Sequence, residues 1–396
     1  MSSLSSSLVF SSRLPSRLAV NALARAVAAR RASGGDFLDL TQTNPTTAGI
    51  PYPADVLAPL ADGPASCYEP HPRGLLSARE AVVAEYAADW PGLAPDRVVL
   101  TASTSEAYAM LFKLLCDAGD EVLVPQPSYP LFDLLTRLEA VQPRPYRLEY
   151  HGVWSVDRDS VAAALGPRTR ALLVVTPNNP TGSRLRAADR DWIAGLCAAR
   201  GIAVISDEVF AGYPLAARAD AVGFAGETRA LTFVLGGLSK SAGLPQVKLA
   251  WLVVGGPSPV VDTALARLDV ILDTYLSVST PVQVAAASLM ASGRVVRAAI
   301  QARLVRNLGA LQALVDRSPA VALIAPEGGW SVVIRVPATV PEEALVLRLL
   351  KTADVLVHPG YFFDFAHEAF LVLSLLPDPA VFDDGAGRVL AAVAGQ

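Results

Sequence analysis

Lysine is rare in this chain, and one of the four lysines lies where its amine could act as a nucleophile. Lys240 lies in a turn rich in glycine and serine, 236–243, that follows a short apolar run. A lysine amine can form a Schiff base with an aldehyde, which is the basis of several kinds of covalent catalysis. The same turn, taken alone, is also consistent with an ordinary solvated lysine.

Two other polar side chains follow short apolar runs in the same way. Asp207 comes soon after the run 202–205, and Asn179 lies in the turn 176–182, which follows the run 171–175. Two prolines and a glycine constrain that turn. An aspartate at such a point either forms a turn or is a buried charge that needs a cationic partner.

A further segment could bind an anion. Ser103 and Glu106 follow the apolar run 98–101 and have the spacing of a capping box, which predicts that a helix begins here. The free amides of such a helix end, together with the hydroxyls of Ser103, Thr104 and Ser105, can hold a phosphate. Without other features the segment predicts only a capped helix.

The amine, the carboxylate and the phosphate-binding helix end together fit one cofactor. Lys240 would form a Schiff base with its aldehyde, and Asp207 would keep a pyridine nitrogen protonated so that the ring accepts electrons. The helix end would anchor its phosphate. The combination predicts pyridoxal 5′-phosphate.

A sheet must position these residues. Strand-like runs that are apolar on both faces alternate with helical stretches from about residue 98, a pattern typical of a mostly parallel sheet covered by helices. In such sheets the chemistry lies beyond the carboxyl ends of the strands, where the polar residues above are found. The expected strands are 98–101, 121–124, 171–175, 202–205, 232–235 and 250–254.

The rest of the chain predicts a smaller second unit. A long helical zone is expected at 282–315, followed by strands at 330–336 and 370–376. We expect an N-terminal arm and part of a small domain at 1–49, a large cofactor-binding domain at 50–285 and a small C-terminal domain at 286–396.

Composition excludes several classes of protein. The chain has 396 residues, of which 52% are hydrophobic and 18% charged, and its net charge is −4. It can bury a large core, and no overall positive field attracts nucleic acid or acidic membranes. The uncharged run between Asp273 and Arg294 contains Pro281 and Gln283, which argues against a membrane helix.

The cysteines and the N-terminus favour a cytoplasmic location. Cys67, Cys116 and Cys197 are far apart and lack metal-ligand spacing, so we expect small buried side chains and no disulfide framework or metal site. Residues 1–35 contain five arginines and many serines, as transit peptides do, but 18–29 is typical of an ordinary amphipathic helix.

Three segments together resemble one family. PNNPTG (177–182), SDEVF (206–210) and LSKSAGLPQVKLAW (238–251) are similar to the class I/II aminotransferases, which are pyridoxal-phosphate-dependent enzymes of fold type I. The similarity extends to Tyr68 in YEPHPRG and Gly360 in HPGYFF. It implies an α/β fold, with a large domain built on a mostly parallel seven-stranded sheet and a small α/β domain formed from both chain ends.

The resemblance also implies residue roles. Lys240 would form the Schiff base and then shuttle a proton between substrate and cofactor, Asp207 would pair with the ring nitrogen, and Asn179 would bind the phenolic oxygen. Tyr129 would stack on the ring, Ser103, Thr104, Ser105 and Lys248 would bind the phosphate, and Tyr68 would reach a phosphate in the neighbouring subunit of a homodimer with shared sites.

The chain departs from the family pattern at three cofactor positions. Phe210 replaces a tyrosine, so a donor to the phenolic oxygen is lost unless Tyr213 reaches it, and the pKa of the Schiff base should rise. Lys248 replaces an arginine and supplies a point charge without a bidentate fork. Gly237 replaces a serine that many relatives carry.

A fourth departure concerns the substrate. Val372 stands where the family has the arginine that binds the substrate α-carboxylate. Either Arg73 supplies that contact, or the substrate has no carboxylate there, or the alignment is shifted, although no residue in 369–377 is basic. We therefore expect weak activity with common α-amino acid donors.

Three functions are consistent with these residues. An aminotransferase that moves an amino group between an amine or amino acid and a keto acid is the leading one. A carbon–sulfur lyase or decarboxylase would use the same cofactor chemistry, and a non-catalytic regulatory relative would keep the fold alone. The presence of Lys240 argues against the regulator.

Overall fold

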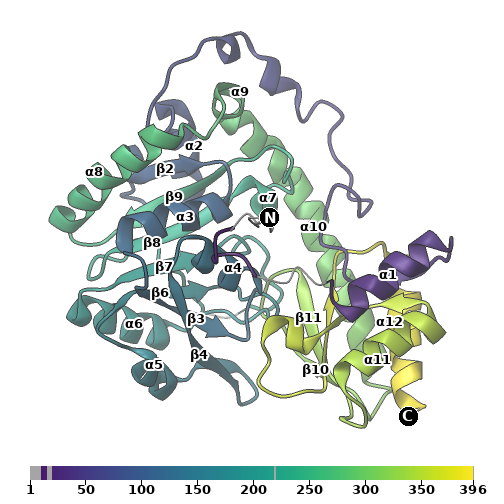
Figure 1. The fold of residues 1–396 in the computed structure, drawn as a ribbon. Helices are drawn as coiled ribbons and strands as arrows, with labels where there is room; N and C mark the ends of the chain where they lie inside the picture. The colour runs from purple at the N-terminus through teal and green to yellow at the C-terminus, as the bar shows by residue number, and fades with distance from the viewer. Residues whose placement is uncertain (1–9, 16–19, 218–219, 396) are drawn as a thin grey trace, which may run out of the picture.

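The structure is a computed structural model that describes residues 10–15, 20–217 and 220–395. Its largest feature is an eight-stranded sheet (Figure 1). From one edge to the other the sheet contains β2 (Val98–Thr101), β9 (Ala250–Gly255), β8 (Thr232–Gly237), β7 (Ala203–Asp207), β6 (Thr169–Val175), β3 (Glu121–Gln126), β4 (Gln142–Tyr150) and β5 (Trp154–Val156).

This sheet confirms the predicted α/β class. The five strands from β8 to β4 are parallel to one another, whereas β9 and β5 run antiparallel to their neighbours. The expected count of seven strands was one too low, because the short β5 turns back and pairs with the end of β4.

Helices cover both faces because the central strands are apolar on both faces. In β6, Leu172 and Val174 point into one hydrophobic cluster, while Leu173 and Val175 point into the other. One cluster is covered by α3 (Thr104–Leu115), α4 (Leu131–Leu138) and α8 (Ser258–Tyr275), and the other by α2 (Leu76–Glu85), α5 (Arg158–Ala164), α6 (Ala187–Arg200) and α9 (Thr280–Val284).

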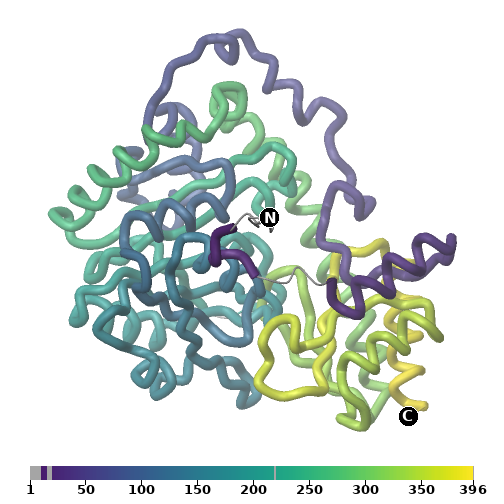
Figure 2. Tube along the Cα trace, viewed as in Figure 1, coloured from purple at the N-terminus to yellow at the C-terminus, as the bar shows by residue number. Residues whose placement is uncertain are grey.

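Segments from both ends of the chain pack around a smaller antiparallel sheet and form a further hydrophobic cluster, separate from the two clusters on the large sheet (Figures 1 and 2). This sheet contains β10 (Ala322–Ile324), β11 (Ser331–Arg335), β14 (Phe370–Ser374) and β13 (His358–Pro359), and a separate parallel pair joins β1 (Leu38–Asp39) to β12 (Val355–Leu356). The helices packed here are α1 (Ala22–Ala32), α11 (Glu342–Arg348) and α12 (Pro379–Ala394).

One long helix, α10 (Ala286–Val315), contacts both regions. Leu289 belongs to a cluster of the large sheet, whereas Leu304 and Leu311 belong to the cluster of the small one. The predicted boundary between residues 285 and 286 falls where this helix begins, and the division into domains stays a prediction. The remaining short helical segments are α7 (Leu238–Ser241), Ala58–Ala61, Gly63–Ser66, Pro95–Arg97, Leu349–Ala353 and Gly360–Phe363.

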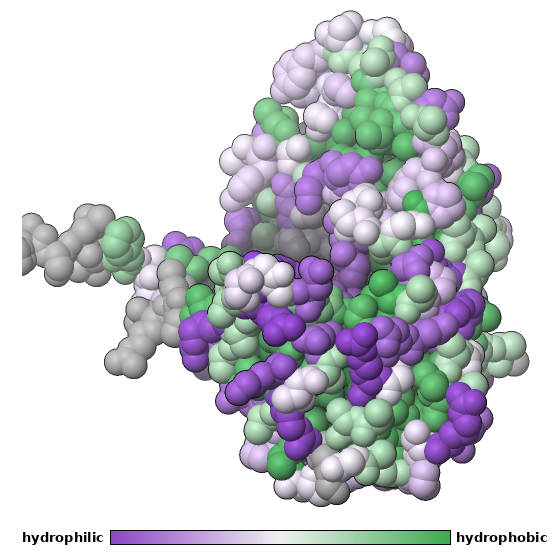
Figure 3. Space-filling model, turned by 90° about the vertical axis from the view of Figure 1, so that its right-hand side faces the viewer, coloured by the Kyte–Doolittle hydropathy of each residue, from purple (hydrophilic) through white to green (hydrophobic). Residues whose placement is uncertain are grey.

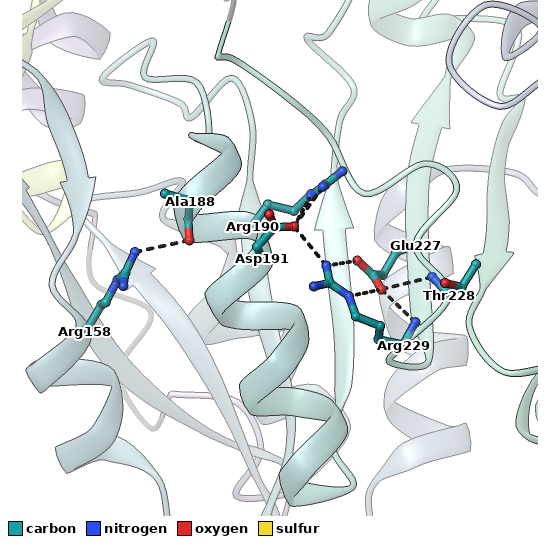
Figure 4. Close-up of polar contacts among 7 residues, drawn as sticks. All are labelled: Arg158, Ala188, Arg190, Asp191, Glu227, Thr228 and Arg229. Atoms are coloured by element: carbon teal, nitrogen blue, oxygen red, sulfur yellow. Dashed lines mark hydrogen bonds and ion pairs between the residues drawn. The ribbon is translucent and has the colours of Figure 1, made fainter.

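Charged side chains tie α6 to the loop before β8 (Figure 4). Arg229 donates to Asp191 on α6 at 3.0 Å and to Glu227 at 2.7 Å, and Arg190 also donates to Asp191 at 2.8 Å. The two arginines lower the pKa of Asp191 through these hydrogen bonds. Because Asp191 and Arg229 are exposed, we expect the ion pair between them to contribute little to stability.

The helices, the surface and the cysteines bear on three of the expectations above. Within the described ranges, no helix has both the length and the apolar character needed to cross a bilayer. Figure 3 shows hydrophilic residues gathered around a hollow on one face of the molecule. All three cysteines are unpaired, and the expectation that they are buried holds for Cys197 but is wrong for Cys67, which is exposed.

Candidate active site

The carboxyl ends of three adjacent strands bring Asn179, Asp207 and Lys240 to one edge of the large sheet. Asp207 is the last residue of β7 and pairs in register with the last residue of β6. Lys240 lies on α7, directly after β8, and Asn179 lies four residues beyond β6. The adjacency of the parallel strands β6, β7 and β8 therefore accounts for the proximity of these residues.

Asp207 is a buried carboxylate held from two sides. Its Oδ2 accepts a hydrogen bond from the hydroxyl of Tyr108 at 2.8 Å, and its Oδ1 accepts one from the amide of Val209 at 3.2 Å. Burial raises the pKa of Asp207, and these hydrogen bonds and the charge of Lys240 oppose that rise only in part. The expectation that Asp207 is ionised therefore depends on a cationic partner above it, such as a pyridinium ring.

Sequence analysis missed Tyr108. This tyrosine lies on α3, four residues after Thr104, and is almost fully buried, so the pKa of its hydroxyl is raised well above its ordinary value. Its neighbours Ala107 and Leu111 on the same helix face the sheet. A tyrosine on the buried face of the predicted phosphate-binding helix was a usable signal, because a buried hydroxyl needs a partner.

We expect Tyr108→Phe to shift the pH dependence of turnover. Loss of this donor to a charged group removes about 1.5–3 kcal/mol of stabilisation from ionised Asp207, so the pKa of Asp207 rises and the acid limb of the kcat profile moves to higher pH. Tyr146→Phe is the control, because Tyr146 is equally buried but donates to the carbonyl of Leu173 at 2.8 Å. Equal profiles for the two variants would contradict the role of Tyr108.

Lys240 points its amine at two aromatic rings. Its Nζ lies 4.7 Å from the ring centroid of Trp330 and 5.5 Å from that of Phe210. Burial lowers the pKa of Lys240, and the charge of Asp207 opposes that shift. The hydroxyl of Tyr213 donates to the backbone carbonyl of Lys240. Tyr213 thus holds the lysine backbone in place, and its hydroxyl is engaged there.

Close contacts with strand β9 explain why position 237 is a glycine. A Cβ on Gly237 would lie 3.0 Å from the Cβ of Ala250 on the neighbouring strand β9, and a Cβ on Gly236 would lie 2.4 Å from Trp251. A side chain at 237 would therefore require Ala250 to give by a few tenths of an ångström, and one at 236 would require the indole of Trp251 to shift. The local packing of β8 against β9 thus favours glycine where many relatives have serine.

The turn that contains Asn179 is bonded to the segment before β11. Gly182 has a φ of +67°, and its carbonyl accepts the amide of Glu327 at 2.9 Å. The carboxylate of Glu327 in turn accepts from Arg186 at 2.6 Å. Ser331 donates to the Oδ1 of Asn179 at 3.4 Å. The turn is therefore fixed from both regions of the molecule.

The capping box at the start of α3 is confirmed. The hydroxyl of Ser103 accepts the amide of Glu106 at 3.1 Å, and the Glu106 carboxylate accepts the amide of Ala102 at 2.6 Å. Thr104 and Ser105 are the first two residues of the helix, so their amides have no partner within it. These groups suit a phosphate.

Lys248 lies close in register to this helix end. It is exposed, has a φ of +61°, and stands two residues before Ala250, which pairs with Thr101 across the antiparallel strands β9 and β2. Lys248 and Ser103 therefore both lie just beyond the same end of this strand pair. A positive charge there is suited to the same anion.

A cavity of about 410 Å³ opens beside Asn179 and Tyr129. Tyr129 is partly exposed, with 43% of its surface accessible, and its ring packs edge-on against Phe132. Val372 forms part of the wall, at the position discussed above. The cavity is lined by Asn21, Thr41, Thr43, Tyr129, Pro130, Asn179, Ser331, His358, Phe362, Phe363, Val372 and Ser374.

The structure does not bring Arg73 to this cavity. The Nε and Nη2 atoms of its guanidinium each donate to the carboxylate of Asp269 at 2.6 Å, and Nη1 donates to the backbone carbonyl of Asp96 at 2.9 Å. We therefore withdraw the expectation that Arg73 binds substrate in its own subunit. Tyr68 also lies outside the cavity, with 70% of its surface accessible.

Because Glu208, beside Asp207, is buried, we expect the free energy of unfolding to depend on pH. It accepts hydrogen bonds from the Ser206 hydroxyl and the Phe224 amide, both at 2.7 Å, yet burial raises its pKa from 4.5 to about 7. The folded state thus keeps a proton that the unfolded state loses, so this stabilisation is complete below pH 4.5 and is lost as the pH rises through 7.

The raised pKa of Glu208 lets us estimate how much the free energy of unfolding falls with pH. At about 1.36 kcal/mol per pKa unit, the rise from 4.5 to about 7 corresponds to a loss of about 3 kcal/mol. Glu208→Gln stays neutral, so we expect the variant to lose much less stability than the wild type between pH 5 and pH 8. Urea unfolding at the two pH values measures the difference. The same decrease in both proteins would contradict the assignment.

The residues at this edge of the sheet fit pyridoxal phosphate. Among the described residues, the buried carboxylate of Asp207 has no cationic hydrogen-bond partner, so it suits the ring nitrogen of this cofactor. The amine of Lys240, which lies against aromatic faces, suits the aldehyde. The hydroxyl-rich end of α3 suits the phosphate. The geometry defines a class: an α/β enzyme that binds this cofactor beyond the carboxyl ends of its parallel strands.

Comparison with known proteins gives the family. The family described as Aminotransferase class I and II matches residues 38–383, and the chain belongs to it. Members of this family are pyridoxal-phosphate-dependent aminotransferases, and this chain is an enzyme of that kind.

Relatives and solved structures agree. The chain is 27% identical over 357 residues to alanine aminotransferase of Mycobacterium tuberculosis, covering 87% of this chain and 83% of that one. It is 25% identical to glutamate-pyruvate aminotransferase AlaA of Escherichia coli K12, covering 84% of each. An aminotransferase structure from Escherichia coli aligns with a TM-score of 0.86 at 22% identity, covering 98% and 99% of the two chains.

Proposed function

We propose that Lys240 is the catalytic residue of this aminotransferase and that Asp207, Asn179, Tyr129, Ser103, Thr104, Ser105 and Lys248 hold the cofactor. The observation that supports this proposal best is the position of the Lys240 amine, which faces Trp330 and interacts electrostatically with buried Asp207. When bound, pyridoxal phosphate withdraws electrons from the carbon that bears the substrate amine, so that its proton can leave.

Lys240 moves that proton. Burial lowers the pKa of its amine, which increases the neutral fraction that can accept a proton. Asp207 holds the proton on the ring nitrogen, and Tyr108 keeps the carboxylate oriented. Asn179 would donate from its Nδ2 to the phenolic oxygen of the cofactor, while its Oδ1 accepts from Ser331.

We also propose a cytoplasmic homodimer with shared active sites. Tyr68 is exposed and lines a groove with Leu276, another large apolar side chain with half its surface accessible. Exposed apolar side chains that lie together are typical of an interface. Three unpaired cysteines suit a reducing compartment. Sedimentation of the holoenzyme tests the dimer, and a monomer would contradict it.

Borohydride reduction tests the role of Lys240. Reduction of the purified yellow holoenzyme makes the cofactor–lysine bond permanent, and peptide mapping then identifies the modified side chain. Because the chain has only four lysines, peptide mapping can distinguish which of them carries the cofactor. We expect the label on Lys240, and a label on Lys113, Lys248 or Lys351 would overturn the proposal.

A further inference from the structure

The cavity beside Asn179 and Tyr129 has features that a substrate must match. We propose that the preferred amino donor is a primary amine with no carboxylate on its amine-bearing carbon. This preference rests on the proposed function above, because the cavity is taken as the substrate site. It goes beyond the relatives, whose names refer to amino acids.

The described part of the wall contains no permanent positive charge. Among the described residues that line the cavity, none is a lysine or an arginine, and Val372, Phe362 and Phe363 give it an apolar side. The strand β14 places Val372 between Val333 on β11 and His358 on β13. A carboxylate buried against this side would lose its water without gaining a cation, which is costly.

Three of the five hydroxyl side chains in the wall, those of Thr41, Ser331 and Ser374, have already donated their hydrogens within the protein. A hydroxyl group has one hydrogen, so a group that donates it within the protein offers a ligand only lone pairs. Lone pairs repel carboxylate oxygens and accept hydrogen bonds from N–H or O–H groups. The hydrogen of Thr41 goes to Asp39 at 2.5 Å, that of Ser331 to Asn179 at 3.4 Å and that of Ser374 to the carbonyl of Gln42 at 2.6 Å.

His358 does not replace the missing cation. Its ring packs against Phe362 and Phe363, with centroids 5.7 and 5.8 Å away, and burial lowers the pKa of the imidazole. The charge of Asp39 acts in the opposite direction but does not reverse the shift. Near neutral pH the imidazole is therefore mostly neutral, and the carboxylate of Asp39 adds negative charge nearby.

Binding measurements on the holoenzyme test this preference without catalysis. Isobutyramide and isobutyrate have nearly the same shape and differ in charge. We expect isobutyramide to bind about tenfold more tightly than isobutyrate, and Val372→Arg to reverse that order by supplying a cation. Val372→Leu is the control, since it fills the same wall without charge and should keep the wild-type order. Tighter binding of isobutyrate to the wild type would overturn the inference.

Turnover of paired donors gives the second test. Isopropylamine and alanine, and phenethylamine and phenylalanine, differ only in the group on the amine-bearing carbon. We expect the amine of each pair to convert the bound cofactor to its pyridoxamine form with kcat/KM about tenfold higher or more. Faster conversion by the amino acids would overturn this inference alone. Failure of every donor would overturn the proposed function, and the inference with it.

Discussion

Lys240→Ala should reduce transamination on the order of 10⁴-fold or more, because one side chain supplies both the covalent attachment and the proton transfer. The Lys240 amine faces the rings of Trp330 and Phe210, and Lys240 is the one lysine on α7. Steady-state turnover with a saturating donor measures the loss, and the visible absorbance of the purified protein measures the attachment.

Lys351→Ala is the matched control. Lys351 is an exposed lysine in the segment Leu349–Ala353, outside every contact described for the site. We expect this variant to keep wild-type turnover and colour. Turnover of Lys240→Ala within about tenfold of the wild type would contradict the assignment of Lys240 as the catalytic residue.

Asp207→Asn should lower kcat about 10²- to 10⁴-fold, since removing one partner of a buried ion pair costs about 3–5 kcal/mol. The amide keeps the shape of the carboxylate but cannot hold the proton of a pyridine nitrogen. Burial raises the pKa of Asp207 in the structure. The cofactor-free variant should therefore unfold at a urea concentration no lower than the wild type, which separates a catalytic loss from a folding defect.

Asp120→Asn provides the comparison for Asp207. Asp120 is also buried, but it pairs with Arg170 at 2.8 and 3.1 Å, outside the catalytic edge described above. We expect Asp120→Asn to lose stability and to keep its kcat, the opposite of the result for Asp207→Asn. A decrease in kcat of the same size in both variants would contradict a specific role of Asp207 at the ring nitrogen.

The sequence predicted those parts of the site that depend on local chemistry. The capping box of Ser103 and Glu106 is visible within four residues, and the structure has it as predicted. The ends of β6, β7 and β8 follow from short apolar runs, and adjacency of parallel strands then places Asn179, Asp207 and Lys240 together.

The parts that were missed depend on contacts between distant segments. Tyr108 bonds to Asp207 across 99 positions, and Trp330, which directly precedes β11, reaches Lys240. The ion pair of Arg73 was also missed, because its partner, Asp269, lies 196 positions further along the chain. No local pattern in the sequence reveals such a pairing, since an arginine beside a glycine has the same composition whether it is free or bound.

The hydrogen bond between Gly182 and the segment before β11 restricts the motion of the turn that contains Asn179. Glu327 joins the turn of Asn179 to that segment, so any displacement of this turn is coupled to the part of the wall that includes Ser331. Asn21 and Thr41 border the same cavity from the N-terminal part of the described chain. The contact expected to bind the cofactor and the contacts expected to bind the donor therefore share one wall, and a change at Glu327 should alter both.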